Sequence, residues 1–449
     1  MSESRGRGRV TRYGAIAMAF WLCAGTVRAA DSDVITFWNK AVIDATITNL
    51  TPARPNPETA AVLAYMHIAM YDAISSIDGD YTPFATRVTN IPAVVSREAA
   101  ATEAAYRVLA HYYPSATFAT IATQFDSAYA QQINAIPNGS AKTNGMAVGL
   151  AAANGIIALR DGDGFRASVS YTFLPLGPGV YQKTPGSDGT LATYAGPVTP
   201  WEARFKPFTM LAQNQFRVDG PPALESAQWA EDFNEVKSFG AASNLPNSRS
   251  AEQQEIGLFY GLINAQAQIA KTLRGIITDQ NLSLAQSARF LAQVSVTIAD
   301  AQIGCWDSKY YFNFWRPVTA IQHADIDGND ATDVNSTWMP QIVTPGHPEW
   351  PSAHGCSTAA YAHAIAEFSG TKRLPGGITL FGPVNHPNRH FDSTDDIVKE
   401  IIDARVYNGV HYRTSVVQGT VLGRKVAQWV AKFYFQPVDA HTPEGPKAK

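Results

Sequence analysis

The sequence has little of several features that would mark particular classes of protein. Charged residues make up 16% of its 449 residues and the formal net charge is −3, so no positive excess is available to bind nucleic acid. Low charge together with 45% hydrophobic residues favours a compact globular chain over a disordered one. The chain also lacks a repeat of fixed period, a linker and a shift in composition. We therefore predict one domain over residues 31–449.

Long apolar runs are also missing, except for one near the N-terminus. Four arginines precede the apolar residues 13–25, and Val27-Arg28-Ala29 follows. This order is typical of a secretory signal peptide over residues 1–30, so we expect export to the periplasm or the cell exterior. The run is well short of the ~20 residues that a membrane span needs, and we expect no span in the mature chain.

Cysteine is rare as well. Of the three cysteines, Cys23 lies in the predicted signal peptide, which leaves Cys305 and Cys356. In an oxidising compartment these two can form one disulfide, whereas as two buried thiols they behave like small apolar side chains. The sequence leaves both interpretations open.

Helical periodicity, in contrast, is abundant. Glycine and proline are frequent between 165 and 222, where no period persists. Elsewhere apolar and alanine residues recur at helical spacing, at 59–77, 96–113, 116–133, 141–159, 225–239, 251–270, 283–306, 356–368, 394–408 and 416–435. These patterns predict an all-α fold built of helical bundles, with one long irregular segment.

Residues 345–355, with the sequence Pro-Gly-His-Pro-Glu-Trp-Pro-Ser-Ala-His-Gly, are the segment around which we expect the functional site. Prolines bracket the segment and a helix-like run follows at once. This pattern predicts a stiff loop that leads into a helix N-terminus. Free backbone N–H groups and the positive end of the helix dipole attract an oxyanion at such a place.

Basic side chains flank this loop on both sides. Lys309 and Arg316 are two helical turns apart, so we expect both on one face of a helix. A helix end is predicted between Arg405 and His411, which places the histidine on the turn after the helix of Arg405. Cations within apolar sequence need an acidic partner or a bound anion, and only two aspartates stand near them. We predict that the four groups converge on one tetrahedral oxyanion, such as phosphate or vanadate.

These residues form three separated motifs, which read Lys309 with Arg316-Pro317, Pro351-Ser352-Ala353-His354, and Arg405 with His411. In order and spacing they resemble the motifs of the vanadium-dependent haloperoxidases and the related type 2 phosphatidic acid phosphatases. That pattern is a lysine, six residues and Arg-Pro, then Pro-Ser-Gly-His, then an arginine, five residues and a histidine. The helical texture extends the resemblance over most of the mature chain, toward secreted bacterial haloperoxidase-like proteins, with the active-site half at 283–435.

The resemblance implies an activity and a cofactor. The activity is oxidation of halide by hydrogen peroxide to hypohalous acid, and the cofactor is vanadate, without haem. Vanadium would act as a Lewis acid and would not change its redox state. The residues implied to bind vanadate are Lys309, Arg316, Ser352, Ala353 through its N–H, Arg405 and His411.

The resemblance also assigns catalytic roles. His411 would ligate the metal, His354 would be the acid–base that takes a proton from hydrogen peroxide, and Lys309 would support catalysis by its charge. His347 stands where bromoperoxidases of the family carry histidine, and Trp306 where a chloroperoxidase tryptophan lines the halide site. This pair favours bromide or iodide. A loop histidine that caps a backbone group is the alternative for His347.

Two positions depart from the family pattern. Ala353 replaces the glycine of the second motif. Ser415 stands four residues after His411, where the family usually has an aspartate that orients the histidine, so we expect weaker support of the imidazole. Asp300 and Asp403 are the candidates to supply the missing carboxylate.

Other functions fit some of the same residues. An acid phosphatase would use His411 as the nucleophile that forms a phosphohistidine and His354 as the general acid. A periplasmic protein that binds an oxyanion without turnover is a second alternative, which the missing aspartate suggests. A zinc or iron site made of His347, His354 and His411 is a third, although their spacing fits no common ligand pattern. The alanine-rich helices are also compatible with a homo-oligomer.

Overall fold

The computed structural model describes residues 33–185 and 197–438. The signal peptide predicted over residues 1–30 lies outside the described residues. The predicted all-α fold is confirmed, because helices make up almost all the regular structure of the described part. Its strands are β1 (Ile378–Leu380) and β2 (Arg389–Phe391), which pair as a short antiparallel hairpin.

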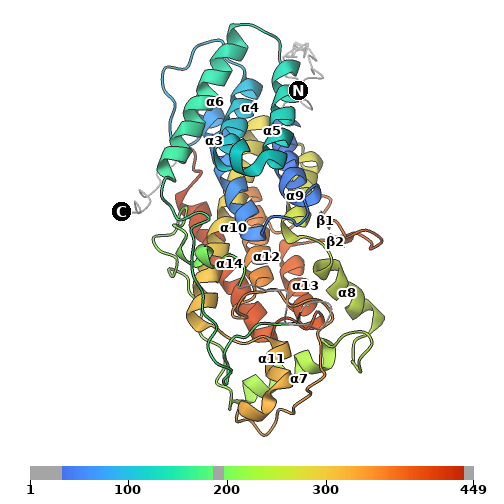
Figure 1. Cartoon of the computed structure of the whole chain (residues 1–449). Coiled ribbons are helices and arrows are strands. Elements are labelled where there is room, and N and C mark those ends of the chain that lie inside the picture. Colours follow the sequence, from blue (N-terminus) through green and yellow to red (C-terminus); the bar gives the residue numbers. More distant parts are fainter. Residues whose placement is uncertain (1–32, 186–196, 439–449) are drawn as a thin grey trace, which may run out of the picture.

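The helices of the first half gather at one end of the molecule (Figure 1). They include the buried α3, against which α4 and α6 pack. After α6 the described chain is irregular up to α7 apart from η2 (Pro200–Arg204), which confirms the predicted irregular segment. The helices up to that point are α2 (Asp33–Ile43) with the π-helical turn η1 (Asp44–Thr48), α3 (Asn56–Asp78), α4 (Arg97–Tyr112), α5 (Ser115–Ala135) and α6 (Ser140–Leu159).

The helices of the second half surround the segment that carries the motifs. Figure 1 shows α12, α13 and α14 side by side, and the long α10 extends from them toward α3. These helices are α7 (Ala227–Phe239), α8 (Ala251–Gly261), α9 (Ala265–Asp279), α10 (Leu284–Phe312), α11 (Pro317–Gln322), η3 (Ala324–Ile326), α12 (Ala353–Ser369), α13 (Thr394–Tyr407) and α14 (Arg413–Phe433).

One predicted helix proves to be two. The periodicity predicts a helix at 251–270, but the structure has α8 and then α9, which starts at Ala265. The side chain of Asn264 accepts hydrogen bonds from the N–H groups of Gln266 and Ala267, and so caps the start of a new helix. A local side-chain hydrogen bond therefore decides a boundary that the apolar pattern does not show.

The predicted common helix face for Lys309 and Arg316 is wrong. Helix α10 ends at Phe312, and Asn313 follows with a φ of 48°, in the left-handed region that ends helices. Arg316 is the N-cap residue of α11. The two cations therefore lie on either side of a tight turn and reach the same place from different elements.

Helix α3 is long and apolar enough to cross a membrane. The sequence analysis expected no such segment in the mature chain. The helix has 23 residues, and 89% of its most apolar window is buried inside the protein. It packs between α4, α6 and α10. This burial is what a core helix of a globular protein requires.

Glycines bring α12 and α14 unusually close together. A Cβ added to Gly419 would lie 2.7 Å from the carbonyl oxygen of Ser352 and 3.0 Å from the backbone nitrogen of Cys356. A Cβ at Gly355 would lie 2.6 Å from the carbonyl oxygen of Val416. Side chains at these places would separate the helices, so the glycines set where the first turn of α12 lies.

Candidate active site

The loop at 345–355 leads into a helix, as predicted. Ser352 is the N-cap residue of α12, and its Oγ accepts a hydrogen bond from the N–H of Gly355 at 3.4 Å. Ala353 and His354 therefore lie in the first turn of α12, where backbone N–H groups have no acceptor within the helix. This confirms the helix N-terminus that makes the segment suitable for an anion.

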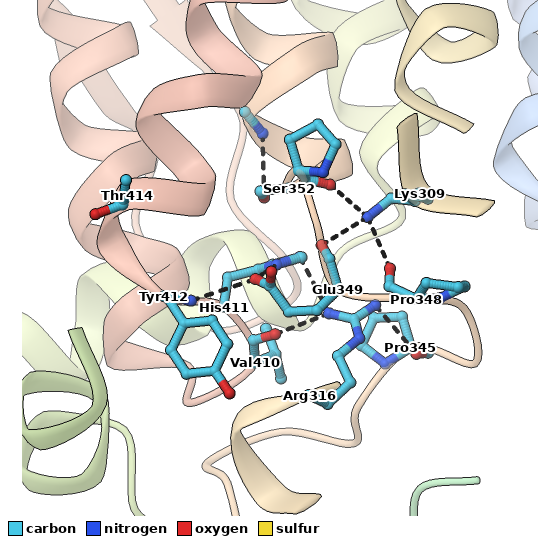
Figure 2. A network of polar contacts seen from close by, with 12 residues as sticks. Lys309, Arg316, Pro345, Pro348, Glu349, Ser352, Val410, His411, Tyr412 and Thr414 are labelled. Carbon is cyan, nitrogen blue, oxygen red and sulfur yellow. Dashed lines mark hydrogen bonds and ion pairs between the residues drawn. The ribbon is translucent and has the colours of Figure 1, made fainter. Parts of the chain in front are cut away.

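Three cations are buried around this loop. Lys309 and Arg316 are 0% exposed and Arg405 is 1% exposed. The Lys309 ammonium donates to the carbonyl oxygens of Pro348 at 3.0 Å and Glu349 at 2.9 Å (Figure 2). No ion pair joins Lys309 or Arg405 to a carboxylate in the part of the chain that the structure describes. The site therefore holds excess positive charge, which favours an anion.

Arg316 holds the loop and the two histidines in place. Its guanidinium donates to the carbonyl oxygens of His347 at 2.9 Å and Val410 at 2.8 Å. It also contacts His411 Nε2 at 3.2 Å and His347 Nδ1 at 3.0 Å. Because arginine only donates hydrogen bonds, His411 Nε2 is the acceptor in its contact with Arg316.

Arg405 is the cation with the fewest partners. Its Nε and Nη1 are buried and have no hydrogen-bond partner among the described residues. Burial and the nearby charge of Arg316 lower the pKa of Arg405 to about 9. Burial, with the charge of Arg316, likewise lowers the pKa of Lys309 to about 8. An anion bound among these groups would satisfy the open donors and restore both pKa values toward their usual range.

His411 is held by a carboxylate that the sequence analysis missed. Its Nδ1 lies 2.6 Å from Glu349 Oε1, and both side chains are buried (Figure 2). Since Nε2 accepts from Arg316, the proton is on Nδ1, which donates to Glu349. His411 therefore keeps a lone pair on Nε2, the state needed to bind a metal or attack phosphorus.

Glu349 thus takes the role that was sought at Ser415, Asp300 or Asp403. Asp300 instead accepts hydrogen bonds from the N–H groups of Phe208 and Thr209, and Asp403 pairs with Arg413. The suggestion that either aspartate compensates for Ser415 is wrong. The signal that could have found Glu349 is an ionisable residue within an otherwise apolar and proline-rich loop, between His347 and His354.

Burial and cations control the protonation of this centre. Burial raises the pKa of Glu349 to about 7, although the charges of Arg316 and Lys309 oppose the shift. Burial and then Arg316, Lys309 and Arg405 hold the pKa of His411 well below its usual value. The pKa of His354 is held down by burial and by the same three cations, with Arg405 acting most strongly. The structure therefore places His354 and His411 within electrostatic reach of Lys309, Arg316 and Arg405.

The two halide-site candidates also lie together. The rings of Trp306 and His347 are 5.0 Å apart between centroids and tilted by 44°. His347 Nδ1 lies 3.0 Å from a guanidinium nitrogen of Arg316, which donates, and 3.2 Å from the carbonyl oxygen of Pro348, which accepts. The contact with Pro348 agrees with the alternative of a loop histidine that caps a backbone group. The active-site cavity measures about 270 Å³ and is lined by Trp306, His347, Ala353, His354 and His411 among others.

The two cysteines are free thiols. Cys305 on α10 and Cys356 on α12 are both buried, and Cys305 Sγ lies 3.8 Å from the carbonyl oxygen of Pro351. Of the two open interpretations, the structure has the one without a disulfide. A metal cluster of three or more histidine, cysteine or acidic side chains is absent from the described residues, which argues against the zinc or iron alternative.

Comparison with known proteins agrees with this geometry. The family model described as the second helical-bundle domain of VCPO matches residues 289–440. Vanadium chloroperoxidase from Curvularia inaequalis is 23% identical over 290 residues, which are 49% of this chain and 47% of that protein. The chain thus spans about half the length of this curated relative.

Solved structures share the fold over much more of the chain. The crystal structure of the first bacterial vanadium-dependent iodoperoxidase aligns with a TM-score of 0.74 and 22% identity, over 93% of this chain and 99% of that chain. A holo-type bacterial vanadium-dependent chloroperoxidase aligns with a TM-score of 0.66 and 17% identity, over 86% of this chain and 93% of that chain. The described chain therefore has the helical fold of these solved structures, and residues 289–440, which carry the three motifs, match the second helical-bundle domain of VCPO.

Proposed function

We propose that this protein is a vanadate-dependent haloperoxidase, which oxidises halide with hydrogen peroxide to hypohalous acid. The observation that carries the proposal is the buried cationic centre, with two nitrogen donors of Arg405 that have no partner among the described residues and with His411 Nε2 unprotonated and facing Arg316. A tetrahedral oxyanion with a metal at its centre satisfies both features at once, because arginine donates to its oxygens and imidazole nitrogen ligates the metal.

The residues present fit vanadate. Lys309, Arg316 and Arg405 would compensate the charge of its oxygens. The Ser352 hydroxyl, whose oxygen already accepts from Gly355, has its proton free to donate, and the Ala353 N–H lies in the open first turn of α12. His411 would be the metal ligand. When bound, vanadate supplies a Lewis acid that makes peroxide oxygen electrophilic without a change of metal redox state.

His354 fits the acid–base role. It lies in the cavity wall on the first turn of α12, and its pKa is held well below the usual value by burial and the neighbouring cations. The imidazole is therefore neutral before peroxide arrives and can accept a proton from it. Glu349 is a positioning residue, since it acts through His411 and does not line the cavity.

Bromide or iodide is the proposed substrate, rather than chloride. The single imidazole of His347, beside the ring of Trp306, would offer at most one N–H donor to a halide in a largely apolar cavity. A small, strongly hydrated chloride loses more on leaving water than a larger halide does, and one donor compensates less of that loss.

An acid phosphatase is the second candidate, because the lone pair of His411 and the same cations also suit a phosphoryl group. One experiment separates the two. Purified protein is incubated with and without vanadate and given peroxide with iodide, bromide or chloride, and hypohalous acid is trapped by a dye. We expect vanadate-dependent turnover that phosphate suppresses by competition. Phosphomonoester hydrolysis that vanadate abolishes, with no halide oxidation, would contradict the proposal.

We also propose that the chain is exported, on the strength of the signal pattern at residues 1–30. N-terminal sequencing of the mature protein from a secreting host tests this. Cleavage after Ala29 or Ala30 is expected, and a cell-associated protein that keeps residues 1–30 would contradict it.

A further inference from the structure

The active-site cavity has a polar region that the proposed function has not used. Ser357 lines the cavity and lies one helical turn after His354, so both side chains are on one face of α12. Gln302 lines the cavity from α10, one helical turn before Trp306. The two helices pack against each other. Gln302 and Ser357 therefore lie one turn along their helices from the residues assigned to proton transfer and to the halide.

A hydrogen bond joins these two side chains between the helices. Gln302 is 3% exposed, and its Nε2 donates to Ser357 Oγ at 3.2 Å. Its carbonyl oxygen, Oε1, is buried and has no hydrogen-bond partner among the described residues. A buried amide carbonyl without a partner is unfavourable. A bound molecule with an O–H or N–H group would satisfy this oxygen.

The pair offers both an acceptor and a donor to such a molecule. Gln302 Oε1 is the acceptor. Because Ser357 Oγ accepts from Gln302, the proton of the Ser357 hydroxyl is available as the donor. A small molecule that both donates and accepts hydrogen bonds can therefore bind to both side chains at once. Hydrogen peroxide has this property, whereas a halide ion only accepts.

The charge of the cavity wall also favours an uncharged molecule. No aspartate, glutamate, lysine or arginine is among the described residues that line the cavity. The side-chain oxygen of Asn56, at the start of α3, belongs to the same wall and is a second buried carbonyl oxygen without a partner among them. Carbonyl oxygens carry partial negative charge and repel anions. The polar wall therefore suits a neutral molecule with O–H groups better than it suits a halide.

We propose that Gln302 and Ser357 bind hydrogen peroxide at a place separate from the halide candidates Trp306 and His347. The inference rests on the proposed function, in which peroxide is a substrate. Peroxide donates one hydrogen bond to Gln302 Oε1 and accepts one from the Ser357 hydroxyl. No covalent bond forms or breaks there. The pair holds peroxide in the same cavity as His354, so that it is oriented before it reaches the oxyanion centre.

Steady-state kinetics of the vanadate-loaded full-length protein test this site. Gln302→Met removes the polar atoms of the amide and keeps the length of the side chain. We expect the KM for peroxide to rise about fivefold, the usual effect of one lost hydrogen bond. The kcat at saturating peroxide and the KM for bromide should stay unchanged, because His354 and the halide candidates are intact. Ser357→Ala should also raise the KM for peroxide. An unchanged KM for peroxide in Gln302→Met would overturn the inference.

Gln293→Met is the matched control. Gln293 lies on the same helix, is 2% exposed and also has an Oε1 without a partner among the described residues, but it does not line the cavity. Its replacement should leave the KM for peroxide unchanged. An equal rise in KM for Gln293→Met and Gln302→Met would assign the effect to the packing of α10 and overturn the inference.

Crystals of the vanadate-free protein soaked in hydrogen peroxide give a readout without turnover. We expect electron density for one peroxide molecule between Gln302 Oε1 and Ser357 Oγ in the wild type, and none in Gln302→Met. Density that is the same with and without peroxide would overturn the inference. Failure of the proposed function looks different, because the wild type then oxidises no halide at any concentration of peroxide.

Discussion

At the scale of single residues, the arrangement of charge decides what the centre can bind. Glu349 accepts a hydrogen bond from His411 Nδ1–H, and Arg316 donates to Nε2, so the imidazole has one tautomer. Two buried nitrogen atoms of Arg405, Nε and Nη1, have no hydrogen-bond partner among the described residues. The tautomer makes His411 Nε2 suitable as a metal ligand. The unpartnered nitrogens of Arg405 leave a positive charge that favours a bound anion.

Glu349→Gln should weaken vanadate binding by about 10–100-fold, the usual effect of losing a hydrogen-bond partner behind a metal ligand. The amide is neutral and can present its NH₂ group to Nδ1, which favours the wrong tautomer of His411. A vanadate titration followed by intrinsic fluorescence measures the affinity. Ser415→Ala serves as the control with a smaller effect, since its hydroxyl is not the contact to Nδ1. Equal vanadate affinities for the wild type and Glu349→Gln would show that Glu349 does not support vanadate binding.

Arg405→Met should have opposite effects on stability and on binding. The variant replaces a buried, uncompensated cation with an apolar side chain of similar length, so we expect the vanadate-free protein to gain about 1–3 kcal/mol in unfolding free energy. Vanadate affinity should fall at least a hundredfold. Urea unfolding and the same titration measure the two quantities.

The control for this variant is Arg413→Met. Arg413 is partly exposed and pairs with Glu235 at 2.8 Å and Asp403 at 2.7 Å, so its loss should leave stability unchanged or lower by less than about 1 kcal/mol. A loss of stability in the vanadate-free Arg405→Met variant would show that Arg405 has a partner that our argument lacks.

At the scale of elements, close helix contacts position the first turn of α12. Gly419 on α14 lies directly under the carbonyl of Ser352, so the anion-binding end of α12 depends on a residue that never touches the site. Another contact between helices involves His67 of α3. Its Nδ1 lies 2.7 Å from Oγ of Ser295 on α10, so a hydrogen bond connects these two helices. His67 is an interhelical core residue, as its apolar surroundings in the sequence favour.

Gly419→Ala should destabilise the protein by about 1–3 kcal/mol, since overpacking of a tight contact forces the helices apart. The added Cβ would lie 2.7 Å from the carbonyl oxygen of Ser352, so vanadate affinity should fall as well. Gly275→Ala on α9 is the control. Its Cβ would meet Phe381 at an ordinary 3.7 Å, and the change should stabilise the helix by about 0.5–1 kcal/mol. Thermal unfolding that ranks the two variants the other way would contradict this packing argument.

Because His67 is buried, we expect the stability of the protein to fall as the pH is lowered. Burial lowers the pKa of His67 to about 3, below its usual 6.5. As the pH falls below about 6.5 the unfolded chain takes up this proton and the folded protein does not, so stability falls, by up to about 1.4 kcal/mol per pH unit from this residue. His67→Gln should reduce that slope between pH 6.5 and 4, whereas His390→Gln, on the exposed face of β2, should not. Chemical denaturation at a series of pH values gives the slopes.

At the scale of the whole molecule, the site joins segments that the chain keeps far apart. Lys309 comes from α10, Arg316 from the start of α11, Ser352 from the start of α12, Arg405 from α13 and His411 from the turn before α14. An anion held by all five links the helices of the second half to one another. Anion binding should therefore stabilise the protein against global unfolding as well as against local opening.

Vanadate at one hundred times its dissociation constant should stabilise the folded protein by about 2.7 kcal/mol. The midpoint of thermal unfolding should rise accordingly in the wild type and stay unchanged in His411→Ala. A wild-type midpoint that does not depend on vanadate concentration would show that the five segments form no common anion site.

Sequence alone determined the features that depend on residues a few positions apart. The order and spacing of Lys309, Arg316, Ser352, His354, Arg405 and His411 indicated the oxyanion centre, and helical periodicity indicated most helices to within a few residues. These features were accessible because a helix face, a cap or a motif depends on residues a few positions apart. The single domain over 31–449 and the signal peptide stay predictions.

Only the tertiary structure decided which groups meet across the chain. It replaced Ser415, Asp300 and Asp403 with Glu349 as the partner of His411, a contact between residues 62 positions apart. It put Lys309 and Arg316 on two elements, because Asn313 ends α10 in a left-handed turn. It also left Arg405 without an acid. Such pairings depend on how packed helices orient side chains in three dimensions, and the spacing of residues along the chain does not determine that orientation.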